Sequence, residues 1–118
     1  MKRALAVDDS ATMRNLVKIA LEAEGFTVDT AENGQEALEL TKRNTYDIVI
    51  SDINMPVMDG LTFLREFRAN NKRTPVLMLT TETEARKKEQ AKSLGATGWI
   101  VKPFKPEDLV KVVKRVVR

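Results

Sequence analysis

Short apolar runs alternate with amphipathic segments along the whole chain. The apolar runs predict five strands, at residues 3–8, 26–30, 47–52, 75–80 and 98–101. After each run, apolar residues recur every three or four positions, which is the spacing of a helix's buried face. Five helices are predicted in this way. The first begins after Ser10, the second at Gln35, the third after Gly60 and the fifth at Pro106, and the fourth covers residues 82–94. The chain therefore repeats one strand-plus-helix unit five times.

The predicted helix at residues 82–94 has the weakest apolar stripe of the five. Its apolar residues are Ala85, Ala91 and Leu94, so most of its surface is expected to face water. Gly95 follows it and can adopt the left-handed conformation that ends a helix. We expect this helix to be the least firmly anchored element.

The order of the elements predicts the fold class. Strands that are separated by a crossover helix run parallel, and strands that are apolar along their length are typical of a sheet covered on both faces. The sequence therefore predicts an α/β protein, a three-layer α/β/α sandwich around a five-stranded parallel sheet. Its 118 residues are the length of one domain.

Composition excludes several classes of site. The chain has no Cys and no His, which excludes disulfides, thiolate nucleophiles, imidazole bases and zinc sites built on these residues. Uninterrupted apolar stretches such as Val76–Leu79 are far shorter than the roughly 18 residues of a membrane span. The N-terminus reaches Asp8 too soon to hold a secretory signal. We therefore expect a cytoplasmic protein without membrane insertion.

The net charge of +3 is unevenly distributed along the chain. Residues 1–59 carry 6 basic and 11 acidic side chains (6 − 11 = −5), and residues 60–118 carry 14 and 6 (14 − 6 = +8). A basic half is compatible with nucleic-acid binding. A solvated exterior explains it better, because the last helix places its charges opposite a valine stripe and the chain offers no aromatic stacking platform.

Polar side chains stand where four of the five predicted strands end. In an open parallel sheet the ligand crevice lies outside these carboxyl ends. The residues found there are Asp8, Asp9, Asp52, Thr80, Thr81 and Lys102. Neighbouring carboxylates resist ionising together, so the cluster requires a cation, and ligation by oxygen alone favours Mg²⁺, or Mn²⁺ in its place. Such a site suits phosphoryl transfer, in which the ion and a lysine neutralise the transferring group.

These segments resemble the receiver domains of two-component response regulators, particularly the single-domain CheY-like chemotaxis type. The resemblance covers essentially the whole chain and rests on four motifs: AVDDS, ISDINMPVMDG, PVLMLTTE and GATGWIVKPF. It implies a flavodoxin-like sheet of strand order 2-1-3-4-5 and a receiver domain over residues 1–118. It also implies a phosphorylated signalling protein that catalyses only its own phosphorylation and dephosphorylation, not an enzyme for outside substrates.

The resemblance also assigns roles to the residues at the strand ends. Asp52 is expected to be the phosphoacceptor and, with Asp9, a direct Mg²⁺ ligand. Asp8 would act through water, and the backbone carbonyl of Asn54 would complete the protein's ligands. Thr80 resembles the hydroxyl that turns toward the phosphoryl group, and Lys102 the cation that pairs with it. The peptide between Lys102 and Pro103 resembles one that is cis in the family, which the sequence alone cannot show.

Three further residues are expected to tune the response. Trp99 stands where the family's aromatic switch residue is Tyr or Phe, and its larger indole is harder to bury. A packing role in the fifth strand would account for a tryptophan at this position equally well. Asn54 and Glu82 would line the path of the hydrolytic water, and a polar pair there suggests quick self-dephosphorylation. We expect an apolar replacement of either residue to lengthen the phosphorylated state, measured as a slower release of phosphate; unchanged rates in both variants would contradict this.

The resemblance implies partners as well. The phosphodonor would be a histidine kinase, a phosphatase is a further candidate partner, and a downstream protein would read the fourth helix, fifth strand and fifth helix. That contact region would include Lys87, Lys88, Lys92, Trp99 and Lys105. Two alternatives stay open. One is a module excised from, or feeding, a DNA-binding regulator or a phosphorelay; the other is a Mg²⁺-dependent phosphatase with an aspartate nucleophile, although Asn54 stands where such an enzyme usually has a second carboxylate.

Overall fold

The computed structural model describes residues 2–81 and 85–117, and these form five strands and five helices in strict alternation. In chain order the elements are β1 (Arg3–Val7), α1 (Ala11–Glu22), β2 (Thr27–Ala31), α2 (Gly34–Arg43), β3 (Ile48–Asp52), α3 (Gly60–Asn70), β4 (Val76–Thr80), α4 (Ala85–Ser93), β5 (Gly98–Val101) and α5 (Pro106–Val116). The predicted elements are confirmed. The second strand is shifted by one residue, and residues 82–84 of the predicted fourth helix lie outside the described part.

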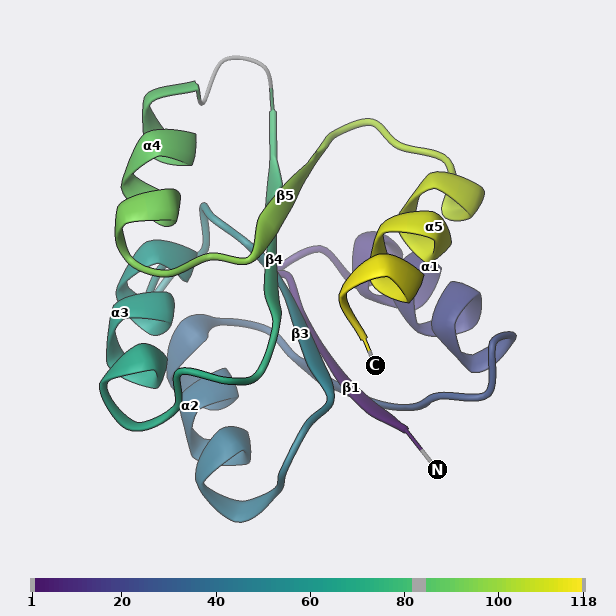
Figure 1. The fold of residues 1–118 in the computed structure, drawn as a ribbon, viewed down its shortest axis with the longest axis horizontal. Helices are drawn as coiled ribbons and strands as arrows, with labels where there is room; N and C mark the ends of the chain where they lie inside the picture. Colours follow the sequence, from purple (N-terminus) through teal and green to yellow (C-terminus); the bar gives the residue numbers. More distant parts are fainter. Residues whose placement is uncertain (1, 82–84, 118) are drawn as a thin grey trace.

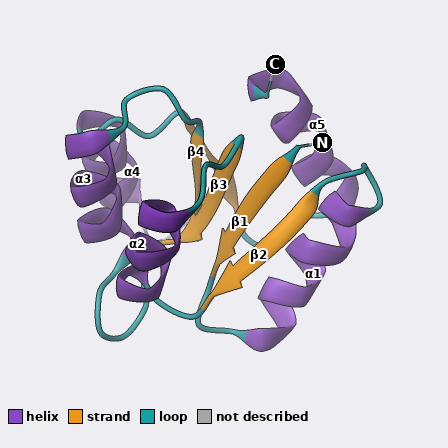
Figure 2. Ribbon diagram, turned by 90° about the horizontal axis from the view of Figure 1, so that it is seen from below, coloured by secondary structure: helices purple, strands orange, loops and turns teal. Residues whose placement is uncertain are grey.

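The strands form one parallel sheet of order β2-β1-β3-β4-β5. The helices α1 and α5 cover one face, and α2, α3 and α4 cover the other (Figures 1 and 2). The predicted three-layer α/β/α sandwich and its strand order are thus confirmed. The strands β1 and β3 are neighbours, and the helices that follow them, α1 and α3, lie on opposite faces of the sheet, so the carboxyl ends of these two strands border the expected crevice.

Each face of the sheet has its own apolar core. On the α1/α5 side, Ala4, Ile50 and Leu79 from the strands meet Leu21 and Leu109 from the helices. On the opposite side, the neighbouring residues of the same strands, Leu5, Val49 and Met78, pack with two aromatic residues of α3. These aromatic residues are Phe63 and Phe67. Burial on both faces explains why the strands are apolar along their length. It also makes the central strands a rigid support for the residues at their ends.

Helix ends agree with local sequence signals. Ser10, Asn33 and Asp59 are N-caps whose side chains accept a hydrogen bond from the third residue of the following helix. Gly25 and Gly95 follow α1 and α4 with φ of 91° and 100°, the left-handed conformation expected after a helix. The fourth helix buries little beyond Ala91 among its described side chains, as its weak apolar stripe predicts.

A polar network near the amino ends of β1 and β3 was not anticipated from the sequence. The hydroxyl of Tyr46 donates to Asp29 Oδ2 at 2.7 Å, and Arg3 Nη2 lies 3.0 Å from the same oxygen. Burial, followed by the contact with the Asp29 carboxylate, raises the pKa of Tyr46 from 10.0 to about 12. The neutral phenol is therefore the form that the fold favours.

We expect Tyr46→Phe to cost about 1 kcal/mol at neutral pH, the net value of a hydrogen bond. The wild type should also lose about 2–3 kcal/mol as pH rises from 10 to 12, because the folded-state pKa lies above the unfolded value. The phenylalanine variant lacks that loss, so the difference in stability should shrink as pH rises and change sign, which leaves the variant the more stable protein near pH 12. Urea unfolding across this range tests the prediction, and phenolate absorbance reports the pKa directly because Tyr46 is the only tyrosine. A constant difference between the two proteins would contradict it.

Candidate functional site

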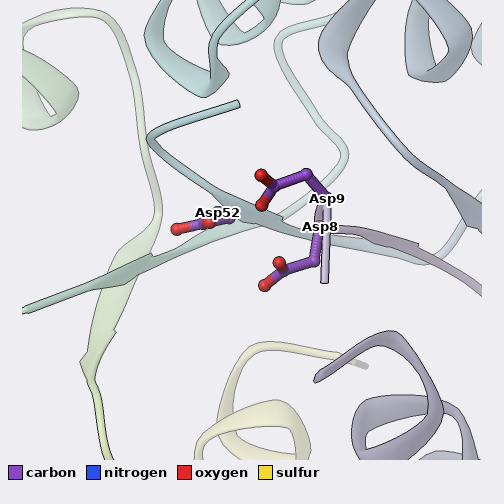
Figure 3. A group of neighbouring side chains, drawn as sticks. All are labelled: Asp8, Asp9 and Asp52. Atoms are coloured by element: carbon purple, nitrogen blue, oxygen red, sulfur yellow. The ribbon is translucent and has the colours of Figure 1, made fainter. Parts of the chain in front are cut away.

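Three aspartates meet at the carboxyl edge of the sheet. Asp8 and Asp9 follow β1, and Asp52 is the last residue of β3. Each offers a carboxylate oxygen to one cluster in which these atoms all lie within 4.8 Å of one another. Figure 3 shows the three carboxyl groups gathered at the ends of the two neighbouring strands. Asp8 and Asp52 are buried, whereas Asp9 is exposed and opens the cluster to solvent.

Lys102 brings a positive charge to the same cluster from the end of β5. Its Nζ lies 3.3 Å from Asp8 Oδ2 and 3.2 Å from Asp52 Oδ1. The backbone N–H of Lys102 donates to the carbonyl of Thr80, which fixes the start of the loop that follows β5. The next peptide bond, to Pro103, is cis, as the resemblance implied.

Backbone groups fix two of the carboxylates. The N–H of Ile53 donates to Asp52 Oδ1 at 2.8 Å, and the N–H of Ser10 donates to Asp8 Oδ1 at 2.9 Å. Gly60 packs against the backbone of Asp52, where a Cβ would lie 2.0 Å from the carbonyl oxygen of Asp52. A larger residue at Gly60 would therefore displace the end of β3 and the carboxylate that it carries.

The electrostatics of the site follow from this crowding. Burial raises the pKa of Asp52, and the nearby Asp8 carboxylate raises it further, while Lys102 opposes both effects. For Lys102, burial lowers the pKa, but Asp52 and Asp8 together raise it more, so it remains an ammonium. The Asp52 carboxylate is therefore a buried anion whose charge is only partly compensated by the protein.

The residues of the cluster fit a small divalent cation. Three carboxylates and one ammonium leave a formal charge of −3 + 1 = −2. All the ligands on offer are oxygen atoms, the donors that Mg²⁺ prefers. Asp8, Asp9 and Asp52 would hold the ion, and its open side at Asp9 leaves room for water and for a phosphoryl oxygen.

Thr80 lies at the end of β4, fully buried, and its hydroxyl has no hydrogen-bond partner among the described residues. A buried hydroxyl without a partner is costly. It supplies a donor at the rim that a phosphoryl oxygen could satisfy. This unpaired atom is a second observation, independent of the carboxylates, that fits an anionic group bound at this edge.

We expect Thr80→Val to stabilise the unmodified protein by about 1 kcal/mol, because a methyl group replaces a buried hydroxyl that has no partner. Thr74 provides the matched control. It is also buried, but its Oγ1 accepts from Asn71 Nδ2 at 2.9 Å, so Thr74→Val should destabilise. Chemical unfolding of both variants measures the effects. A loss of stability in Thr80→Val would show that its hydroxyl is already satisfied in the fold.

The remaining predicted site residues lie around this cluster. Thr81 follows Thr80 and is half-buried. Asn54 is exposed, two residues after Asp52, and its Oδ1 accepts a hydrogen bond from Lys87 Nζ on α4. Trp99 on β5 is 37 % exposed, and the Lys88 ammonium lies 5.4 Å from its ring centroid. Glu82 lies outside the described residues.

Sequence reasoning missed two contacts at this edge. Arg14 on α1 donates to the carbonyl of Asp8 at 2.7 Å, and Lys87 reaches Asn54 from 33 residues away. Neither residue carries a sequence signal that separates it from other charged helix residues. Sequence reasoning also missed the backbone conformation of Val57. This residue is 83 % exposed and has φ of 70°, although a residue with a branched side chain rarely adopts positive φ.

Comparison with known proteins identifies the fold and its site together. Residues 4–114 match the model of the response regulator receiver domain. The chain belongs to this family. Receiver domains are phosphoacceptors of two-component signalling, they take phosphate from histidine kinases, and they typically bind Mg²⁺ at an acidic pocket. This receiver domain has a cluster of three acidic residues, Asp8, Asp9 and Asp52, at the carboxyl edge of its sheet.

Both chemotaxis and transcriptional proteins resemble this receiver domain. The chemotaxis response regulator CheY4 of Vibrio cholerae has a TM-score of 0.93 and 49% identity, over 99% of each chain. The transcriptional regulatory protein ResD of Bacillus subtilis is 39% identical over 116 residues, which cover 98% of this chain and 48% of ResD. The transcriptional regulatory protein SrrA of Staphylococcus aureus is 40% identical over 114 residues, which cover 97% of this chain and 47% of SrrA. The chain thus spans about half the length of these curated relatives.

None of the helices in the described residues is long and apolar enough to span a bilayer.

Proposed function

We propose that this receiver domain accepts a phosphoryl group on Asp52 from the phosphohistidine of a kinase and passes the signal on by a change of its protein-binding surface. One observation carries the proposal. A buried carboxylate, Asp52, lies among two further carboxylates, the ammonium of Lys102 and the unpaired hydroxyl of Thr80. These are the groups that a phosphoryl-transfer site needs, and they come from four different segments.

Apart from the divalent cation, the kinase and this chain supply every group that the reaction requires. A carboxylate oxygen of Asp52 forms a bond to phosphorus as the bond between phosphorus and the imidazole nitrogen breaks, and the imidazole keeps the electron pair. The product is an acyl phosphate. Mg²⁺, when bound, neutralises charge on the transferring group.

The protein's own residues position and stabilise the new group. The hydrogen bond from Ile53 holds Asp52 Oδ1, which leaves its other oxygen for the attack. Lys102, already 3.2 Å from Asp52, pairs with the phosphoryl oxygens, and the Thr80 hydroxyl donates to one of them. Asp9 and Asp52 would hold the divalent ion directly and Asp8 would hold it through water, and the backbone carbonyl of Asn54 would complete the protein's ligands.

The proposed output surface is formed by α4, β5 and α5. It carries Trp99 and the basic residues of α4, so an acidic partner segment with an apolar side chain would suit it. Similarity to CheY4 over the full length of both chains supports chemotaxis, with the flagellar switch as the target. The similarity to about half the length of two transcriptional regulators supports a role upstream of gene control. Binding of the activated protein to a flagellar switch protein, tested directly, separates the two.

Labelling with phosphoramidate tests the central proposal, because this small donor needs no kinase. We expect a Mg²⁺-dependent acyl phosphate, detected by intact-protein mass, that EDTA abolishes. A Mg²⁺-dependent phosphatase is the competing function. Repeated turnover of p-nitrophenyl phosphate would support that function. Incorporation of one phosphoryl group per chain from phosphoramidate, without such turnover, would support the receiver.

A further inference from the structure

A lysine on α4 forms a link to the phosphoacceptor loop that neither the sequence motifs nor the family match assigns. Lys87 Nζ donates to Asn54 Oδ1, and the two residues are 33 positions apart. Asn54 belongs to the loop between β3 and α3, and it lies two residues after Asp52. The contact therefore brings a positive charge to the loop that carries the acceptor, from the face of the sheet covered by α3 and α4.

The fold makes this contact significant because α4 has few other anchors. Ala91 is the α4 side chain that is fully buried in the described part of the helix. Beyond its C-terminal end, Arg68 Nε donates to the carbonyl of Gly95 at 2.9 Å. Lys87 is the corresponding attachment near the N-terminal end. A helix held mainly at its two ends can move at one end when that attachment changes.

The next residue connects the same helix to β5. The Lys88 ammonium lies 5.4 Å from the centroid of the Trp99 ring, which is 37 % exposed. Lys87 and Lys88 are consecutive in α4, so a shift of the helix backbone at this turn moves both residues. Two adjacent lysines thus join the acceptor loop on one side of the helix to the exposed indole on the other.

We propose that Lys87 is a positioning residue of the phosphoacceptor site, which holds Asn54 in the unmodified protein and moves toward the phosphoryl group, so that Lys88 leaves Trp99. This inference rests on the proposed function. The driving force is electrostatic: the acyl phosphate is dianionic, and it attracts an ammonium more strongly than a neutral amide oxygen does. Before phosphorylation, the same charge repels a divalent cation bound beside Asn54.

Magnesium titration by calorimetry tests the charge. We expect Lys87→Met to bind Mg²⁺ about 3-fold more tightly than the wild type, the size of one exposed charge interaction in water. Lys87→Arg keeps the charge and the hydrogen bond and should restore the wild-type affinity. Lys88→Met is the matched control and should not change it. A purely structural role for Lys87 predicts weaker binding in Lys87→Met, and either weaker or unchanged binding overturns the inference.

Beryllofluoride, a phosphoryl mimic, tests the movement. Complex formation is followed by ¹⁹F NMR, and the helix by the fluorescence of Trp99, the only tryptophan. We expect the complex to change Trp99 fluorescence in the wild type, and Lys87→Met to form the complex with less than half of that change. A full-sized change in Lys87→Met, or none in the wild type despite complex formation, overturns the inference. If no complex forms in the wild type, the proposed function itself fails.

Discussion

Asp52→Asn is expected to abolish phosphorylation by phosphoramidate, by roughly 1,000-fold or more, as the removal of a nucleophile does in other group-transfer sites. The amide cannot form an acyl phosphate, yet it preserves the local structure, because its oxygen can still accept from the N–H of Ile53. Intact-protein mass after labelling in Mg²⁺ is the measurement.

The same variant is expected to be more stable than the wild type. Burial and the Asp8 carboxylate raise the pKa of Asp52, so its ionised form is less favourable in the folded protein than in the unfolded chain. A carboxyl group whose folded-state pKa is raised stabilises the fold at low pH and loses that contribution as pH rises. The neutral amide avoids this loss. The increase in folding stability from Asp52→Asn should therefore be present at neutral pH and should vanish in acid.

Asp59→Asn provides the matched control for both effects. Asp59 is a carboxylate in the same loop, and it caps α3 by accepting from the N–H of Thr62, a role that Asn performs equally well. We expect normal labelling and nearly unchanged stability in this variant. Labelling that persists in Asp52→Asn would place the acceptor at another residue and refute the proposed function.

Lys102→Met should destabilise the protein by about 2–3 kcal/mol at neutral pH, because it leaves two buried carboxylates without their cation. Lys102 Nζ is within 3.3 Å of both Asp8 and Asp52. Mg²⁺ should restore much of the loss by replacing the missing positive charge, and should therefore stabilise the variant more than the wild type. Urea unfolding with and without Mg²⁺ measures both effects.

The pH dependence of this variant has a defined sign. Lys102 lowers the pKa of Asp52 in the wild type, so its removal raises that pKa further. The destabilisation should be smallest in acid, where Asp52 is protonated, and should grow as pH rises above the usual pKa of an aspartate, about 4. Lys105→Met is the control, because this exposed lysine makes no side-chain capping bond. Equal losses in the two variants at neutral pH would show that the Lys102 contacts contribute nothing.

The candidate site was largely predictable because parallel strands bring their ends to one edge. Asp8, Asp52, Thr80 and Lys102 are far apart in the chain, but each ends a strand or directly follows one. The alternation of strands and helices requires those strands to be parallel. The strand order came from the resemblance and not from the pattern of residues, because any order of five parallel strands would bury the same apolar runs.

The sequence by itself determined the elements, the layers and the edge at which the chemistry lies, since these depend on local periodicity and on residues adjacent to each strand. Only the tertiary structure decided which polar atoms are paired. The unpaired hydroxyl of Thr80, the bond from Lys87 to Asn54 and the Tyr46 network each depend on side chains from elements distant in the chain. Their distances and burial are set when the helices pack on the sheet, and periodicity along a single chain carries no record of them.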